Sequence, residues 1–254
     1  MFILLPVKAD EWHVNMFLET NAVIAKVDAI GNIYLITNEG TLIKYNREGK
    51  EIADFRERRF GKPGSLDVTN PMKIYLLYPE YSRVVVLDNM LNTKGVFDLN
   101  QRRLNTITNV AFSVDNNFWV YDKTERQVKK LSDNLEVLHE SDDFRMLFNF
   151  DFDPVFMIER NNLLHISDGR NGIALFDLFG SFSKFIPLES VSEFSVDKNW
   201  IYYIESNSLK AYNTRLMIEE SSELPNTEEY ISAVFKNNQL VVLTSKGLTL
   251  YQKR

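Results

Sequence analysis

The amino-acid sequence predicts an all-β fold, a six-bladed β-propeller in which each blade is a four-stranded antiparallel sheet. Three observations support this prediction. A polar turn followed by a short apolar strand recurs six times at a spacing of about 40 residues, which is the period of propeller blades. Further short runs rich in β-branched and aromatic residues precede and follow each copy. The last copy lacks its final strand, as expected where the other end of the chain closes a ring.

The second strand of each module is the clearest element. It follows a polar turn, such as Asn116 and Asn117 or Asn161 and Asn162, and reads as a short run of large apolar residues. The predicted second strands are 33–36, 74–77, 118–121, 163–166, 200–203 and 239–242.

The other strands of the module repeat as well. First strands are predicted at 23–28, 66–69, 110–114, 155–158, 194–196 and 231–235. Third strands are predicted at 42–45, 84–87, 128–131, 173–176, 209–212 and 248–251. Fourth strands are predicted in five modules, at 51–55, 94–97, 136–138, 183–188 and 217–219. Five third strands run into an Asn or Asp, as tight polar turns require.

The sixth module ends after its third strand, so the missing outer strand must come from elsewhere. The apolar run 2–7 predicts that strand, paired with 248–251, and Pro6 suits an edge position that donates no ladder hydrogen bond. Such pairing would hide two exposed strand edges. We therefore predict one domain, 1–254, with blades at about 21–64, 65–106, 107–149, 150–190, 191–226 and 227–254 plus 1–8.

Composition excludes several classes of function. The absence of cysteine removes disulfides, thiol catalysis and cysteine metal sites. A net charge of −6 argues against a nucleic-acid partner, because phosphate binding needs a positive field. No apolar run reaches the roughly 18 residues of a membrane-spanning helix. The N-terminus lacks a basic secretory region, yet the chain could be the mature form of a secreted precursor, so we favour an extracytoplasmic location over a cytoplasmic one.

Charged residues cluster in the links between predicted blades. In a propeller these links share one face with the turns between second and third strands, so the clusters should lie on one surface. Either they only keep the surface soluble or they form an oriented face for a protein partner. The candidate partner-binding residues are basic between the first two blades and acidic between the third and fourth: Arg56, Arg58, Arg59, Lys62, Asp142 and Asp143.

The long link 140–153 is unusually rich in aromatic residues. Phe148, Phe150 and Phe152 alternate with polar residues, which is the period of a strand. Two interpretations stay open. The link extends a first strand or plugs the channel mouth, or it forms an aromatic lip in which Phe144 and Phe148 contact a ligand or partner.

Catalytic motifs are absent. The three histidines, His13, His139 and His165, share no local motif, and His165 stands where other modules have apolar residues, which predicts a buried histidine. The Gly-rich stretch 60–65 lacks both the glycine spacing and the following helix of a phosphate loop. The recurring acids Asp28, Asp115, Glu159 and Asp197 suggest either a central cation site or, as we favour, turn chemistry. We predict no catalytic residue, no metal ligand and no cofactor.

Residues 161–177 resemble an NHL-type repeat, in which a strand, an Asp-Gly turn and a second strand ending in Phe-Asp follow each other; here the turn is Asp168-Gly169 and the end is Phe176-Asp177. Residues 31–49 are a looser copy. The resemblance implies a six-bladed domain that serves as a non-catalytic interaction platform. Other six-bladed propellers are calcium-dependent lactonases, whose Glu, Asn and Asp ligands have no convincing counterparts here. The whole chain also resembles six-bladed domains of envelope proteins from Bacteroidetes-type bacteria.

The sequence therefore predicts a non-catalytic interaction module that presents a charged face to a protein partner in a cell-envelope assembly. A calcium-dependent lactonase-like hydrolase is one alternative. The other is a binder of small molecules or glycans at the channel mouth. Fold alone does not choose among these functions.

Overall fold

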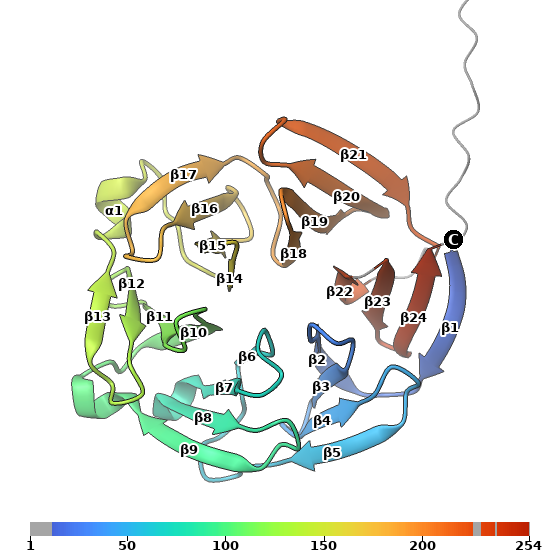
Figure 1. Ribbon diagram of the computed structural model, residues 1–254, viewed down its shortest axis with the longest axis horizontal. Helices are drawn as coiled ribbons and strands as arrows, with labels where there is room; N and C mark the ends of the chain where they lie inside the picture. The colour runs from blue at the N-terminus through green and yellow to red at the C-terminus, as the bar shows by residue number, and fades with distance from the viewer. Residues whose placement is uncertain (1–11, 226–229, 237, 254) are drawn as a thin grey trace, which may run out of the picture.

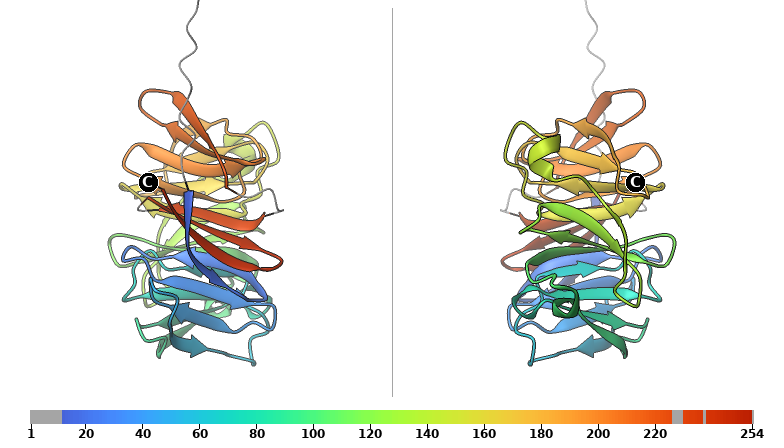
Figure 2. Two further views of the ribbon diagram at one scale, coloured as in Figure 1. Left: turned by 90° about the vertical axis from the view of Figure 1, so that its right-hand side faces the viewer. Right: turned by 90° about the vertical axis from the view of Figure 1, so that its left-hand side faces the viewer.

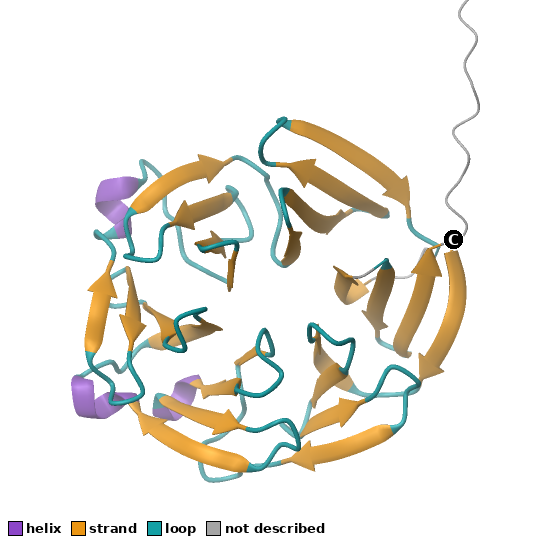
Figure 3. Ribbon diagram, viewed as in Figure 1, coloured by secondary structure: helices purple, strands orange, loops and turns teal. Residues whose placement is uncertain are grey.

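The structure is a computed structural model that describes residues 12–225, 230–236 and 238–253. Six four-stranded antiparallel sheets are arranged in a ring (Figures 1 and 3). The first strand of each predicted module lies innermost, and the fourth lies at the periphery. This is the six-bladed β-propeller that the repeat predicted. No helix in the described ranges is both long and apolar enough to cross a bilayer.

Blades 1 to 3 follow each other along the chain from the inner strand to the outer one. Blade 1 consists of β2 (Ala22–Val27), β3 (Ile33–Thr37), β4 (Leu42–Tyr45) and β5 (Glu51–Phe55). Blade 2 consists of β6 (Ser65–Asp67), β7 (Ile74–Tyr78), β8 (Arg83–Leu87) and β9 (Thr93–Asp98). Blade 3 consists of β10 (Ile107–Phe112), β11 (Phe118–Asp122), β12 (Gln127–Leu131) and β13 (Val137–Glu140).

Blades 4 to 6 complete the ring. Blade 4 consists of β14 (Phe156–Arg160), β15 (Leu163–Ser167), β16 (Ile173–Phe176) and β17 (Phe182–Ile186). Blade 5 consists of β18 (Phe194–Asp197), β19 (Trp200–Glu205), β20 (Ser208–Asn213) and β21 (Ile218–Glu223). Blade 6 consists of β22 (Tyr230–Lys236), β23 (Gln239–Thr244), β24 (Gly247–Lys253) and β1 (Trp12–Leu18). Short helical turns occur at η1 (Pro79–Tyr81), η2 (Leu99–Arg102) and α1 (Phe144–Leu147).

The ring closes through an N-terminal strand, as predicted, but the strand is not the predicted one. β1 pairs antiparallel with β24, and Leu18 lies opposite Leu248 while Val14 lies opposite Tyr251 (Figure 2). The pairing of 2–7 with 248–251 was therefore wrong, and 2–7 itself lies outside the described residues. After a bulge between Val14 and Met16 the side chains alternate, with Met16 and Leu18 packed against the core and Phe17 exposed.

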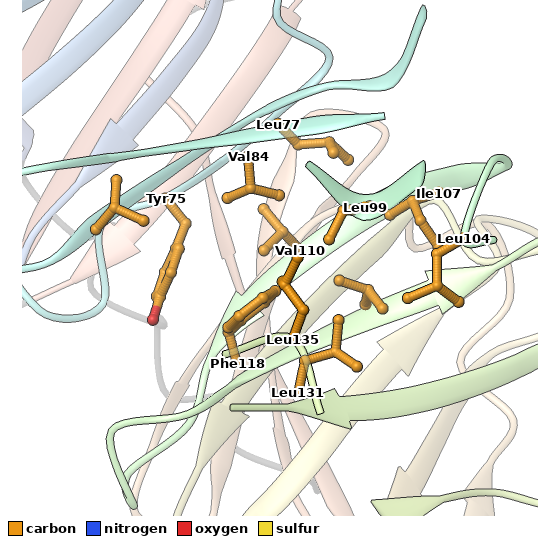
Figure 4. Close-up of a cluster of buried hydrophobic side chains, with 12 residues drawn as sticks. Tyr75, Leu77, Val84, Leu99, Leu104, Ile107, Val110, Phe118, Leu131 and Leu135 are labelled. Atoms are coloured by element: carbon orange, nitrogen blue, oxygen red, sulfur yellow. The ribbon is translucent and has the colours of Figure 1, made fainter. Parts of the chain in front are cut away.

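Apolar side chains fill the space between neighbouring blades. Figure 4 shows the cluster between blades 2 and 3, where Tyr75 and Val84 face Val110 and Phe118 across the interface. The ring of Tyr75 lies 5.2 Å from that of Phe118, measured between centroids. Such blade-to-blade burial is the main source of stability in a ring whose sheets each have only four strands.

The aromatic link 140–153 does not extend a strand or cover the channel mouth. Its helix α1 lies on the outer side of the ring, between blades 3 and 4 (Figure 1). Phe144 is 2% exposed and stacks between Tyr121 of blade 3 and Phe176 of blade 4. Phe148 contacts Phe144 and the outer strand β17. The link is therefore a wedge that joins two blades from outside.

Truncating this wedge should destabilise the whole ring. Phe144→Ala leaves a cavity among buried rings, and we expect the free energy of unfolding to fall by about 3–5 kcal/mol. Urea denaturation measures the change. Met146→Ala is the matched control, because Met146 in the same helix is 83% exposed and should change stability by no more than about 0.5 kcal/mol. Equal effects of the two substitutions would contradict the wedge.

Candidate functional site

The links between blades lie along the turns that join second and third strands, as the sequence analysis expected. The Arg56 guanidinium donates to the backbone carbonyl of Glu39 in such a turn, with an N–O distance of 3.2 Å. In blade 4 the Asn171 amide donates to the carbonyl of Asp151, also at 3.2 Å. These contacts place the charged links on one face of the ring, which we call the link face.

One arginine of the first link and one arginine of blade 2 lie at the same aromatic ring. Phe60 packs edge-on against Tyr78, and the guanidinium carbons of Arg59 and Arg83 lie 5.3 and 6.0 Å from its centroid. Cations over an aromatic face are attracted to its quadrupole. The structure thus gathers Arg83 from the next blade into the cluster, a neighbour that sequence reasoning did not predict.

Arg59 and Arg83 each form an ion pair with a nearby carboxylate. Arg59 binds Glu57, and hydrogen bonds from Arg59 lower the pKa of Glu57 to about 2. Arg83 binds Asp98. Arg56, Arg58 and Lys62 are exposed. We call Arg56, Arg58, Arg59, Lys62 and Phe60 the basic patch.

The acidic and aromatic candidates of the link 140–153 divide into surface and core. Asp142 is exposed, whereas Asp143 is half-buried and caps the start of α1 by accepting from the Arg145 backbone at 2.9 Å. Hydrogen bonds from Arg145 lower the pKa of Asp143 to about 2. Phe144 and Phe148 are buried between blades, so neither side chain forms the exposed aromatic lip that the sequence suggested.

The central channel contains the second candidate site, a cavity of about 760 Å³. Residues of the inner strands β2, β6, β14, β18 and β22 line it. The cavity continues outward between blades 5 and 6, along β20 and β21. Charged side chains in its wall are Lys26, Asp67, Arg160, Glu193, Asp197, Lys198, Glu220, Lys236 and Lys253. Pockets of this volume commonly hold small molecules.

The acids at the ends of the inner strands serve the fold. Asp28 accepts from the backbone N–H groups of Ile30 and Asn32, each at 2.9 Å, and Asp115 accepts from the Asn117 backbone at 3.2 Å. These contacts confirm turn chemistry at Asp28 and Asp115.

The prediction of turn chemistry is wrong at Glu159, whose carboxylate bridges neighbouring blades, as does that of Asp67. Glu159 accepts from the indole of Trp119 at 2.7 Å and from the hydroxyl of Ser113 at 2.6 Å. Asp67 accepts from the backbone of Thr69 at 2.7 Å and from that of Phe112 at 3.2 Å. Neutral donors therefore satisfy both carboxylates.

Three cations of the channel wall come from the inner strands β2, β14 and β22. Lys26 forms an ion pair with Glu193 and lies 4.4 Å above the ring of Phe156. Arg160 donates to the backbone carbonyl of Glu159 at 3.2 Å, and Lys236 donates to that of Val27 at 3.3 Å. Sequence reasoning missed all three cations because it compared only the acids at these positions, although the same comparison would have found them.

The histidines do not form a site together. His139 lies on β13 edge-on to Phe179, and His13 lies on β1. His165 is 3% exposed, and its Nδ1 lies 3.0 Å from the carbonyl oxygen of Leu163. Burial lowers the pKa of His165 to about 4. It is a buried histidine, as predicted from the apolar residues at its equivalent positions.

The described residues contain no group of three or more His, Asp or Glu side chains that could hold a metal ion. A lactonase-type centre needs several converging oxygen ligands around one calcium. The stretch 60–65 is likewise a loop that feeds blade 2, where the Gly64 backbone donates to the carbonyl of Leu77 at 2.9 Å.

Comparison with known proteins supports the fold and goes no further. No family model matches the chain, and no curated protein matches it by sequence. Many solved structures match by fold. Virginiamycin B lyase from Staphylococcus aureus has a TM-score of 0.63 at 11% identity, covering 89% of this chain and 78% of that one. The Pan2 WD40 domain of Neurospora crassa has a TM-score of 0.64 at 10% identity, covering 97% and 86%.

A third similar structure is BamB from Moraxella catarrhalis, with a TM-score of 0.50 at 11% identity, covering 90% of this chain and 71% of that one. These neighbours include a lyase and a WD40 domain, so their shared architecture does not indicate one activity. The chain is a β-propeller module, and its role must be argued from its own surfaces.

His165 should make the fold sensitive to acid. Between the ordinary pKa of 6.5 and the folded value of about 4, the unfolded chain takes up a proton that the folded chain does not. The free energy of unfolding should therefore fall as pH falls through this window, by about 3 kcal/mol in total. Urea titrations at several pH values measure the slope. His165→Leu, which installs the residue found at the equivalent Leu35, should lose this part of the slope; an unchanged slope would refute the assignment.

Proposed function

We propose that the chain is a non-catalytic NHL-like propeller that binds an acidic segment of a protein partner on its link face. The observation that carries the proposal is the basic patch, a short link with three exposed arginines and one exposed lysine, in which Arg59 lies over the ring of Phe60. Arginine and aromatic residues are enriched at the centres of protein interfaces, because they combine a large contact area with directional hydrogen bonds.

The distribution of charge on the link face would orient a bound partner. The basic patch occupies the link from blade 1 to blade 2, and exposed Asp142 lies in the link from blade 3 to blade 4. Complementary charges on a partner would favour one orientation and speed association. The rigid blades support this role, since binding would require no large rearrangement of the scaffold.

The resemblance of residues 161–177 to an NHL-type repeat supports an interaction platform rather than an enzyme. The Asp168 side chain accepts from the backbones of Arg170 and Asn171, at 3.0 and 2.8 Å, and so orders the turn of that repeat. The resemblance to envelope domains of Bacteroidetes-type bacteria supports a cell-envelope assembly as the setting.

Charge reversal tests the basic patch. The test is the triple variant Arg56→Glu, Arg58→Glu, Lys62→Glu, which should retain its fold because all three side chains are exposed. The amount of captured partner should fall at least 10-fold, since each reversed contact costs about 1 kcal/mol or more. Affinity capture from the source cells, with quantitative mass spectrometry and salt titration, measures the loss.

The matched control reverses three exposed cations at or next to turns between third and fourth strands, Lys50→Glu, Lys94→Glu and Arg215→Glu. It carries the same change in net charge. Capture reduced equally by both triple variants would mean that net charge alone matters. Capture unchanged by the basic-patch variant would reject the link face as the docking surface.

A further inference from the structure

The central channel contains two cations that the fold does not neutralise by direct contact. Arg160 ends β14 and Lys236 ends β22, and both line the cavity. Each donates to one backbone carbonyl, Val27 for Lys236 and Glu159 for Arg160. Within the described ranges, neither cation forms an ion pair with a carboxylate, in contrast to the pair of Lys26 and Glu193.

The nearby carboxylates are occupied. Asp28, Asp67 and Glu159 each accept from neutral donors of turns or of the neighbouring blade. A guanidinium has five N–H donors and an ammonium has three, so most of the donors of Arg160 and Lys236 remain for the cavity. Arg160 and Lys236 therefore line the cavity without a described carboxylate in direct contact, although Asp67 lies near both of them.

We propose that the channel binds a small organic anion, whose carboxylate or phosphate group is held by Arg160 and Lys236. This function is independent of the proposed docking on the link face. Arginine suits such a group because its planar fork donates two parallel hydrogen bonds to paired oxygens. The anion would supply the direct ion pair that neither cation forms with a carboxylate of the described residues.

Electrostatics supports the proposal. Burial, and next the charge of Arg160, lower the pKa of Lys236 to about 8, while Asp28 and Asp67 act in the opposite direction. Burial also lowers the pKa of Arg160. Placing two like charges in a partly desolvated channel is unfavourable, and a bound anion relieves both the desolvation and the repulsion.

The rest of the cavity indicates an apolar body for the ligand. Phe156 and Phe194 meet edge-on at 5.0 Å in the channel wall, and Tyr202 and Phe235 lie 4.9 Å apart where the cavity passes between blades 5 and 6. Rings at these positions can bury an aromatic or aliphatic group next to the two cations. The expected ligand is therefore amphipathic rather than a bare inorganic ion.

Calorimetric titration of the full chain with 4-phenylbutyrate tests the proposal, with the neutral 4-phenylbutyramide and inorganic phosphate as the other two probes. We expect 4-phenylbutyrate to bind with a Kd of about 1 mM or lower. The amide should bind at least about 10-fold more weakly, because it lacks the charge-assisted hydrogen bonds. Phosphate should compete with 4-phenylbutyrate, since both use the same cations.

Substitutions locate the site. Arg160→Gln and Lys236→Gln should each lower the affinity for 4-phenylbutyrate at least about 10-fold. Arg160→Lys should lower the affinity less than Arg160→Gln does. The control Lys94→Gln, at an exposed residue, should leave the affinity unchanged. Thermal melting checks that each variant is folded. If Arg160→Gln does not fold, Lys236→Gln still tests the proposal. Equal binding of acid and amide, or no binding of either anion, would overturn the proposal.

Discussion

β1 pairs with β24 and so joins residues from opposite ends of the chain in one sheet. Every other blade takes its four strands from one continuous stretch of sequence, and only blade 6 depends on this long-range pairing. Met16 and Leu18 also pack into the apolar cluster between blades 6 and 1. Closure therefore removes two open edges and completes an interface at the same time.

The channel and the link face both follow from closure. In a closed ring the ends of β14 and β22 meet around one cavity, although 76 residues separate Arg160 from Lys236 in the sequence (236 minus 160). The same geometry puts all the links beside turns of one kind, which is why Arg83 joins Phe60 and the cations of the preceding link. Binding surfaces on propellers arise in this way, from segments that a rigid scaffold brings together.

The strands could be predicted well from the sequence, because each predicted strand can be compared with the equivalent strands of the other five modules. The predicted strands 42–45 and 51–55 coincide with β4 and β5. Prediction failed where local pattern competes with long-range packing. The apolar run 2–7 looked more strand-like than β1, whose alternation is interrupted by a bulge between Val14 and Met16. Phe148 belongs to an alternating pattern, yet its position is set by rings of β17 far along the chain.

Native-state hydrogen exchange tests the dependence on closure most directly. If β1 holds the ring together, the hydrogen-bonded amides of β1 and of its partner β24 should exchange with the same free energy of opening as those of the buried second strands β3 and β15, because opening the closure unfolds the whole ring. Exchange of β1 at a much lower free energy, with the other strands still protected to the global value, would contradict this account.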